Sequence, residues 1–204
     1  MHYEMHLTVS LSPNTPDSIN RFKVVCGEMG VKPIVILADP LVDVMTSFRM
    51  ETDDQNEVFH TMNRHVITLL GKGYHVVRTK VETEVTHPAA LTPLPNQYFE
   101  SHVQVEVSHE DMVTLRELRE GLDFHLSRNA FKVLDNGNSV MMATLREYHT
   151  APDRFTARVE AFRKILEAEG ISVHKNLEIE FALYDSNVKH DQPWLDLSYS
   201  SRQP

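Results

Sequence analysis

Two histidines and several charged residues recur along the chain at a nearly constant spacing of 96 or 97 residues. The recurring pairs are Glu4 and Glu100, His6 and His102, Arg49 and Arg146, Glu82 and Glu178, and Glu84 and Glu180. Imidazoles and carboxylates transfer protons and bind metal ions, and guanidinium groups bind phosphates or carboxylates. The recurring set therefore predicts a polar functional site built from both parts of the chain.

The segments that carry these residues predict the same order of elements twice. Alternation of apolar and polar residues marks the strands, and apolar residues at helical spacing mark the helices. The expected order is strand 2–11, helix 17–29, strands 32–38 and 43–52, helix 55–70, strand 74–85, strand 98–107, helix 109–122, strands 124–131 and 139–149, helix 151–170 and strand 171–187. The chain is therefore expected to contain two βαββαβ units at 1–87 and 98–187, a proline-rich linker at 88–97 and an irregular tail at 188–204.

A βαββαβ unit folds most simply as a ferredoxin-like plait. The sequence thus predicts an α+β fold with an internal duplication, ferredoxin-like (βαββαβ)x2, in which antiparallel sheets carry their helices on one face. In a plait the first strand lies between the fourth and the third. This order brings the recurring residues of each unit together on the sheet face away from the helices, and a composite site is expected where the two sheets meet.

Composition limits the classes of function. A net charge of -9 and a pI near 5.7 argue against an extended nucleic-acid surface. The single cysteine, Cys26, excludes an internal disulfide or a cysteine-rich zinc site and favours the reducing cytoplasm. No stretch approaches the roughly 18 apolar residues of a membrane span, and the first residues lack the pattern of a signal peptide. A cytoplasmic protein that does not contact a membrane is expected.

The first chemistry that the recurring set suits is metal binding. Imidazole with carboxylates from adjacent strands favours zinc, manganese or iron. The expected ligands are Glu4, Glu82, Glu84, Glu100, Glu178 and Glu180, together with His6 and His102. This placement resembles that of the vicinal-oxygen-chelate family, in which each repeated module supplies one ligand from its first strand and a glutamate from its last. That family has no helix corresponding to 55–70, so its fold and reactions are not carried over. A cross-strand network that includes Lys80 is the structural alternative.

The second chemistry is metal-free, with one histidine from each part acting as general acid or base on a phosphodiester. The "HLT" sequence from His6 to Thr8 resembles the His-x-Thr motif of the two-histidine phosphoesterases, although it lies on the opening strand rather than later in the lobe. The corresponding "HVQ" has Gln104 in place of the hydroxyl. The resemblance implies that the histidines are catalytic and that Thr8 and Gln104 bind substrate. Arg49 and Arg146 would contact a small anionic ligand.

The sequence therefore predicts a small-molecule enzyme, with hydrolase or phosphoesterase activity as the favoured class. The alternative is a non-enzymatic ligand-binding or scaffold protein that uses the polar face for docking. Unpaired edge strands of such units also allow a homodimer.

Two segments that do not recur add further candidates. Arg128 in "HLSRNAF" could reach an anion, or form an ordinary surface pair. The segment from Tyr184, through Asp185 and Asp191, to Trp194 could close over a cleft. Alternatively, Trp194 at the end of this segment could pack against the core and cap it.

Overall fold

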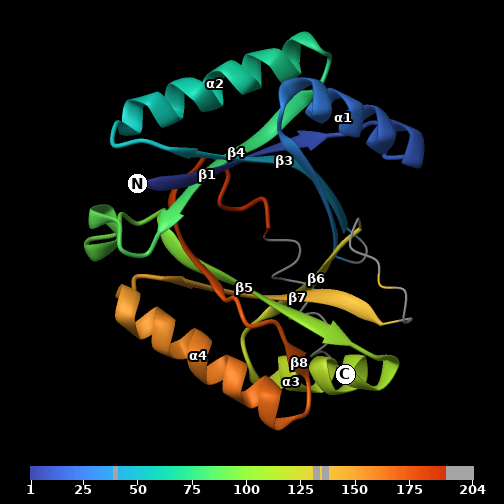
Figure 1. Ribbon diagram of the computed structural model, residues 1–204, viewed down its shortest axis with the longest axis vertical. Helices are drawn as coiled ribbons and strands as arrows, with labels where there is room; N and C mark the ends of the chain where they lie inside the picture. Colours follow the sequence, from blue (N-terminus) through green and yellow to red (C-terminus); the bar gives the residue numbers. More distant parts are fainter. Residues whose placement is uncertain (39–40, 131–133, 135–137, 192–204) are drawn as a thin grey trace.

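A computed structural model shows a closed antiparallel β-barrel, and the α-helices of the described residues, α1 to α4, lie on its outside (Figure 1). The structure describes residues 1–38, 41–130, 134 and 138–191, so the predicted tail beyond 191, with Trp194, lies outside the described residues. The elements are β1 (His2–Ser10), α1 (Pro16–Met29), β2 (Lys32–Ala38), β3 (Leu41–Glu51), α2 (Gln55–Gly71), β4 (His75–Glu84), a 3₁₀ helix η1 (Pro88–Leu91), β5 (Tyr98–Val107), α3 (His109–Gly121), β6 (His125–Asn129), β7 (Ser139–Tyr148), α4 (Pro152–Ala168), β8 (Ser172–Val173) and β9 (Glu178–Asp185). The chain is thus an α+β protein. No described helix is long and apolar enough to cross a membrane.

The prediction of ferredoxin-like units with separate antiparallel sheets is wrong. The strands form one continuous sheet in the order β7-β6-β2-β3-β1-β4-β9-β5, and pairing of β5 with β7 closes it, while β8 adds to the edge of β5. Two seams join the first strands of the chain to the later ones: a five-pair ladder between β4 and β9, and a two-pair contact between β2 and β6. The closed barrel also does not fit the predicted duplication into self-contained units. The strands expected at the edges of the two units, β4 with β9 and β2 with β6, pair with each other and so satisfy their backbone hydrogen-bonding groups.

Local sequence signals explain where the helices begin and end. Helix α1 starts at Pro16 rather than at the expected residue 17, because Thr15 caps it and forms a capping box with Ser18. It ends at Gly30, whose φ of 69° lies in the left-handed region that glycine adopts without strain. The segment expected to form one strand at 171–187 forms β8 and β9 instead. The expected strand 124–131 is β6, and residue 131 lies outside the described residues.

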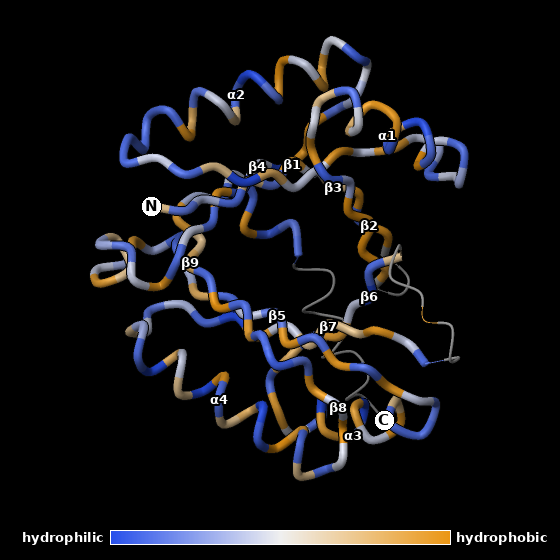
Figure 2. The backbone as a smooth tube through the Cα atoms, in the orientation of Figure 1, coloured by the Kyte–Doolittle hydropathy of each residue, from blue (hydrophilic) through white to orange (hydrophobic). Residues whose placement is uncertain are grey.

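The apolar core lies between the barrel and the helices. In Figure 1, α1 and α2 cover one side of the barrel and α3 and α4 the opposite side. On β1, Met5, Leu7 and Val9 are buried beneath the first pair of helices, and on α4 Phe155 and Val159 are buried against the second half of the sheet. Hydrophobic and hydrophilic residues alternate along β5 and β9 in Figure 2. Apolar side chains therefore face outward, and the alternate side chains of the same strands face the interior of the barrel.

Candidate functional site

The interior of the barrel encloses a cavity of about 730 Å³ that is lined by side chains from all eight barrel strands. Most of the residues in the lining are polar or charged, and the others are isoleucines and methionines. The structure brings nearly every predicted site residue into this lining, namely Glu4, His6, Thr8, Arg49, Glu82, Glu100, His102, Gln104, Arg146, Glu178 and Glu180. Glu84 is the exception: its carboxylate is exposed outside the cavity and accepts a hydrogen bond from the Thr86 hydroxyl at 3.3 Å. The strand order explains why the side chains of the first strands meet: β1 lies between β3 and β4, as expected.

His6 lies in a carboxylate-rich part of the cavity. Its Nε2 is 2.9 Å from Oε2 of Glu82 and 3.6 Å from Oε1 of Glu4. Glu4 also accepts hydrogen bonds from the Ser47 hydroxyl at 2.6 Å and from Nε of Arg49 at 2.5 Å. The Nδ1 of His6 is buried and makes no hydrogen bond within the described part of the chain. His6, whose side chain is 15% exposed, is therefore fixed by the two glutamates.

Arg49 lies at the rim of this cluster, where 69% of its side chain is exposed. Its guanidinium is bonded to Glu4 and lies 3.7 Å from Oε1 of the exposed Glu178. Hydrogen bonding to Glu4 and the surrounding carboxylates raise the pKa of Arg49, so this side chain stays charged. Among the arginines that line the cavity it is the accessible one, because the side chains of Arg78 and Arg146 are 6% and 9% exposed.

His102 and Glu180 face the cavity from β5 and β9. The Nδ1 of His102 is 2.9 Å from the Thr144 hydroxyl, which orients the ring, and 30% of the side chain is exposed. Glu180 makes no hydrogen bond or ion pair with any described residue. Burial, and secondly the negative charge of Glu82, raise the pKa of Glu180 to about 9. Its carboxyl group is therefore protonated at neutral pH.

Glu82 has the opposite protonation state. Although burial raises its pKa, the ammonium group of Lys80 and the hydrogen bond from His6 outweigh this effect and lower the pKa to about 2. One ligand-type atom each of Glu82, His102 and Glu180 lie within 4.8 Å of one another. The cavity thus holds, side by side, an ionised carboxylate, a protonated carboxyl group and an imidazole.

A chain of buried ion pairs crosses the rest of the cavity. Its alternating members, in order of contact, are Asp185, Arg78, Asp191, Arg146, Glu100, Lys80 and Glu82. Arg78 donates to Asp185 at 2.6 Å and to Asp191 at 2.8 Å, and the Tyr98 hydroxyl donates to Asp185 at 2.8 Å. Arg146 bonds Glu100 and Asp191. The deep cations are therefore all engaged with carboxylates of the protein.

These contacts also set the pKa values along the chain of ion pairs. Burial opposes charge at each position, yet the paired carboxylates raise the pKa of Arg78, Lys80 and Arg146. Arg146 and Lys80 together hold the pKa of Glu100 well below its usual range despite burial. These shifts keep Arg78, Lys80, Arg146 and Glu100 ionised at neutral pH, as a buried salt-bridge network requires.

Sequence reasoning missed several lining residues. Arg78 lies on the same face of β4 as Glu82, so a strict two-residue period starting from Glu82 could have identified it, whereas Lys80 was expected only as a member of a cross-strand network. His125 at the start of β6 also lines the cavity, and burial lowers its pKa. Asp43 lies on the same face of β3 as Arg49, so the same two-residue period could have identified it. Arg128, considered as an anion contact, is exposed and does not line the cavity.

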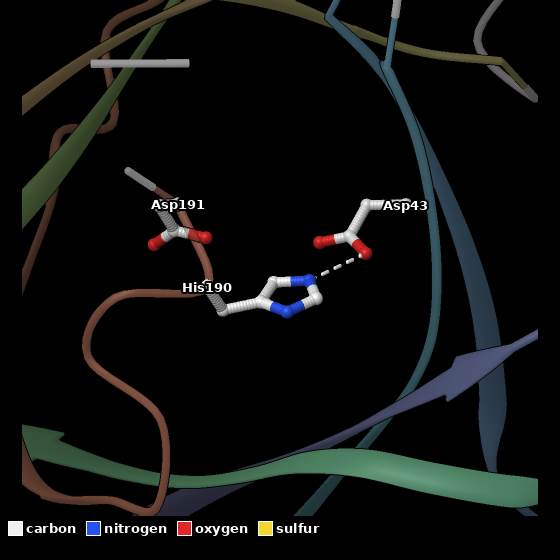
Figure 3. Close-up of side chains that lie close together, drawn as sticks. All are labelled: Asp43, His190 and Asp191. Carbon is white, nitrogen blue, oxygen red and sulfur yellow. Dashed lines mark hydrogen bonds and ion pairs between the residues drawn. The ribbon is translucent and has the colours of Figure 1, made fainter. Parts of the chain in front are cut away.

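The segment that follows β9 enters the barrel interior, as the red trace in Figure 1 shows. It places His190 and Asp191 beside Asp43 of β3, and the Nε2 of His190 is 2.9 Å from Oδ1 of Asp43 (Figure 3). This hydrogen bond raises the pKa of His190. Of the segment that was expected to close over a cleft, Tyr184 and Asp185 belong to β9, and the described residues after β9 enter the barrel interior (Figure 1).

Two groups of side chains have donors spaced closely enough to hold a metal ion. They are Glu82, His102 and Glu180, and Asp43, His190 and Asp191. In each group the ligand atoms lie within 4.8 Å of one another. Each offers one imidazole and two carboxylates, a donor set suited to zinc, manganese or iron.

Comparison with known proteins does not assign the chain to a family. No family model matches it, and no curated protein matches it. An acetolactate synthase small subunit from Thermotoga maritima is 13% identical, with a TM-score of 0.28, over 91% of this chain and 96% of that one. The siroheme decarboxylase NirDL, solved with an iron-uroporphyrin III analogue, is 9% identical, with a TM-score of 0.31, over 98% of this chain and 80% of that one. An unknown protein from Galdieria sulphuraria is 11% identical, with a TM-score of 0.27, over 89% and 98%. At these TM-scores the likeness carries no argument about function.

Proposed function

We propose that the chain is an enzyme that binds a small polar molecule inside the barrel and transfers protons to and from it. The observation that carries this proposal is the convergence of Glu82, His102 and Glu180 on one cavity of about 730 Å³. A cavity of this size holds a small molecule, and ligand pockets typically contain a few convergent polar groups with shifted pKa values. The buried single cysteine fits the reducing cytoplasm as the place of action.

The two histidines that the sequence singled out have different roles in this proposal. His102 is partly exposed to the cavity and is oriented by Thr144, so it is the proton acceptor in this proposal. His6 has its Nε2 bound to Glu82 and its Nδ1 buried, so it acts as a positioning residue that holds Glu82 in place.

Glu180 is the proposed proton donor. It keeps its proton at neutral pH, faces the cavity, and has no partner among the described residues that would hold the proton back. A proton donor and a proton acceptor on neighbouring strands suit hydrolysis of a small ester, phosphoester or glycoside. An anionic group of such a substrate would contact Arg49 at the rim, because Arg146 is already bonded to Glu100 and Asp191.

The test is a panel of chromogenic p-nitrophenyl esters, phosphates and glycosides, assayed with and without a chelator. We expect one class to be hydrolysed, and we expect His102→Gln and Glu180→Gln each to lower kcat/KM by about 10²–10⁴, the usual contribution of a general acid or base. Glu84→Gln is the matched control, because this glutamate lies outside the cavity on the neighbouring strand. Equal activity in all three variants would contradict the proposed roles.

A ligand-binding protein without catalysis is the second candidate, and the dense ion-pair chain favours it. Deep cations that are each ion-paired with carboxylates indicate a rigid, preformed lumen rather than groups that change charge during a reaction. A compound that raises the melting temperature of the protein but is never turned over would support this candidate.

A further inference from the structure

The cluster of Asp43, His190 and Asp191 lies in the same lumen but shares no residue with the proposed catalytic group. It joins two distant parts of the chain, because Asp43 belongs to β3 and the other two residues follow β9. Figure 3 shows the three side chains converging, with the imidazole between the two carboxylates.

One atom of this cluster lacks a partner. The side chain of Asp43 is 9% exposed, and its Oδ1 is hydrogen-bonded to His190, but its buried Oδ2 makes no hydrogen bond within the described residues. A buried carboxylate oxygen without a donor costs free energy, and in native proteins such an atom usually contacts a water molecule or an ion. The unpaired oxygen therefore points to an additional group in the cluster.

The local charges indicate that this group is a cation. The ion-pair chain from Asp185 to Glu82 contains four carboxylates and three cations. Asp43 adds a fifth carboxylate, and the other ion-pair contacts of Glu82 and Asp43 within the described residues are with the imidazoles of His6 and His190. A divalent cation beside Asp43 would supply a positive charge that an imidazole supplies only when it is protonated.

We propose that Asp43, His190 and Asp191 bind one divalent transition-metal ion that ties the segment after β9 to β3. One imidazole and two carboxylates match zinc, manganese and iron, and three protein ligands leave coordination positions open to water. Both oxygens of Asp191 already accept hydrogen bonds from Arg78 and Arg146, but each carboxylate oxygen has a second lone pair for a metal ion. Here the two arginines orient a ligand, as outer-sphere partners of metal sites commonly do.

This inference does not rest on the proposed enzymatic function. All three ligands are side chains of this chain. Binding is therefore measurable without any substrate, and it is expected to stabilise the folded chain.

The experiment is calorimetric titration of the full chain, stripped with a chelator, with Zn²⁺ and separately with Mn²⁺. We expect one equivalent of at least one of these ions to bind with a measurable heat. Asp43→Asn and His190→Ala should weaken the affinity at least tenfold, since even loss of an outer-sphere partner costs 10–100-fold. Far-UV circular dichroism of each stripped variant checks that it folds.

The matched controls are Glu180→Gln and His102→Ala, which alter the other group with metal-compatible spacing. They should leave the affinity unchanged. Binding that is lost in these controls and kept in Asp43→Asn and His190→Ala would place the ion in the other group and overturn the proposal. It would also be overturned if neither ion bound at millimolar concentration, in which case a water molecule or a protonated His190 accounts for the cluster.

Discussion

Replacement of Arg78 by methionine is expected to lower the free energy of unfolding by about 3–5 kcal/mol. The guanidinium bonds Asp185, Asp191 and the Tyr98 hydroxyl, and its side chain is only 6% exposed. Its removal leaves buried carboxylates without a counter-charge, which is the costly way to break a buried ion pair. Chemical denaturation at neutral pH measures the effect.

A matched control for Arg78→Met is Glu28→Gln, which removes the partner of Lys72 in an exposed ion pair. Exposed pairs contribute about 0–1 kcal/mol, so this variant should unfold almost like the wild type. The Ser186 amide donates to the Thr79 carbonyl at 2.9 Å. Its hydrogen exchange should be faster in Arg78→Met, because the segment after β9 loses the ion pair between Asp191 and Arg78 of β4. A loss of stability no larger than that of the control would contradict the assigned role of Arg78.

Replacement of Glu180 by glutamine is expected to stabilise the metal-free protein at pH 8 by about 1–3 kcal/mol. The folded carboxyl group has a pKa of about 9, well above the ordinary value of 4.5. Between these two values the folded state holds a proton that the unfolded state has lost, so stability falls as the pH rises. Glutamine imitates the protonated group and has no proton to lose.

The quantity to measure is the difference in unfolding free energy between Glu180→Gln and the wild type from pH 5 to pH 9, in the presence of a chelator. It should grow as the pH rises. Glu82 affects the pH dependence of stability in the opposite direction and in a lower pH range. Its lowered pKa stabilises the fold above pH 4.5, and this stabilisation is lost as the pH falls toward 2. Parallel pH curves for the two proteins would show that Glu180 is not held protonated. Glu84→Gln controls for the loss of an exposed carboxylate.

Both predictions concern a barrel whose interior is polar and whose outer surface is covered by helices (Figure 1). Apolar side chains such as Leu7 and Phe99 are fully buried outside the lumen, and this burial supplies the main driving force for folding. The charged interior contributes less to net stability than to specificity, because desolvation offsets much of the attraction between buried ions. A preformed polar lumen is useful when it binds something, which is why we place the function there.

The sequence by itself determined the identity and order of most elements and the face on which each strand residue lies. Alternation along β1 requires that His6 and Leu7 point in opposite directions, so the side chains that could do chemistry were separable from the core without coordinates. The neighbours of β1 also followed from the expected order of strands, which is why Glu4, His6 and Glu82 meet as predicted.

The tertiary structure decided what local patterns do not encode. β4 pairs with β9, and β2 pairs with β6, through backbone hydrogen bonds that are nearly independent of side-chain type. The sequence therefore could not show that these strands pair with each other and close a barrel. Closure set the protonation of Glu180, because only it brings Glu82 close and removes water. His190 and Asp191 reach Asp43 across almost 150 positions of sequence through an irregular segment that has no period to read, and only the folded chain brings these residues together.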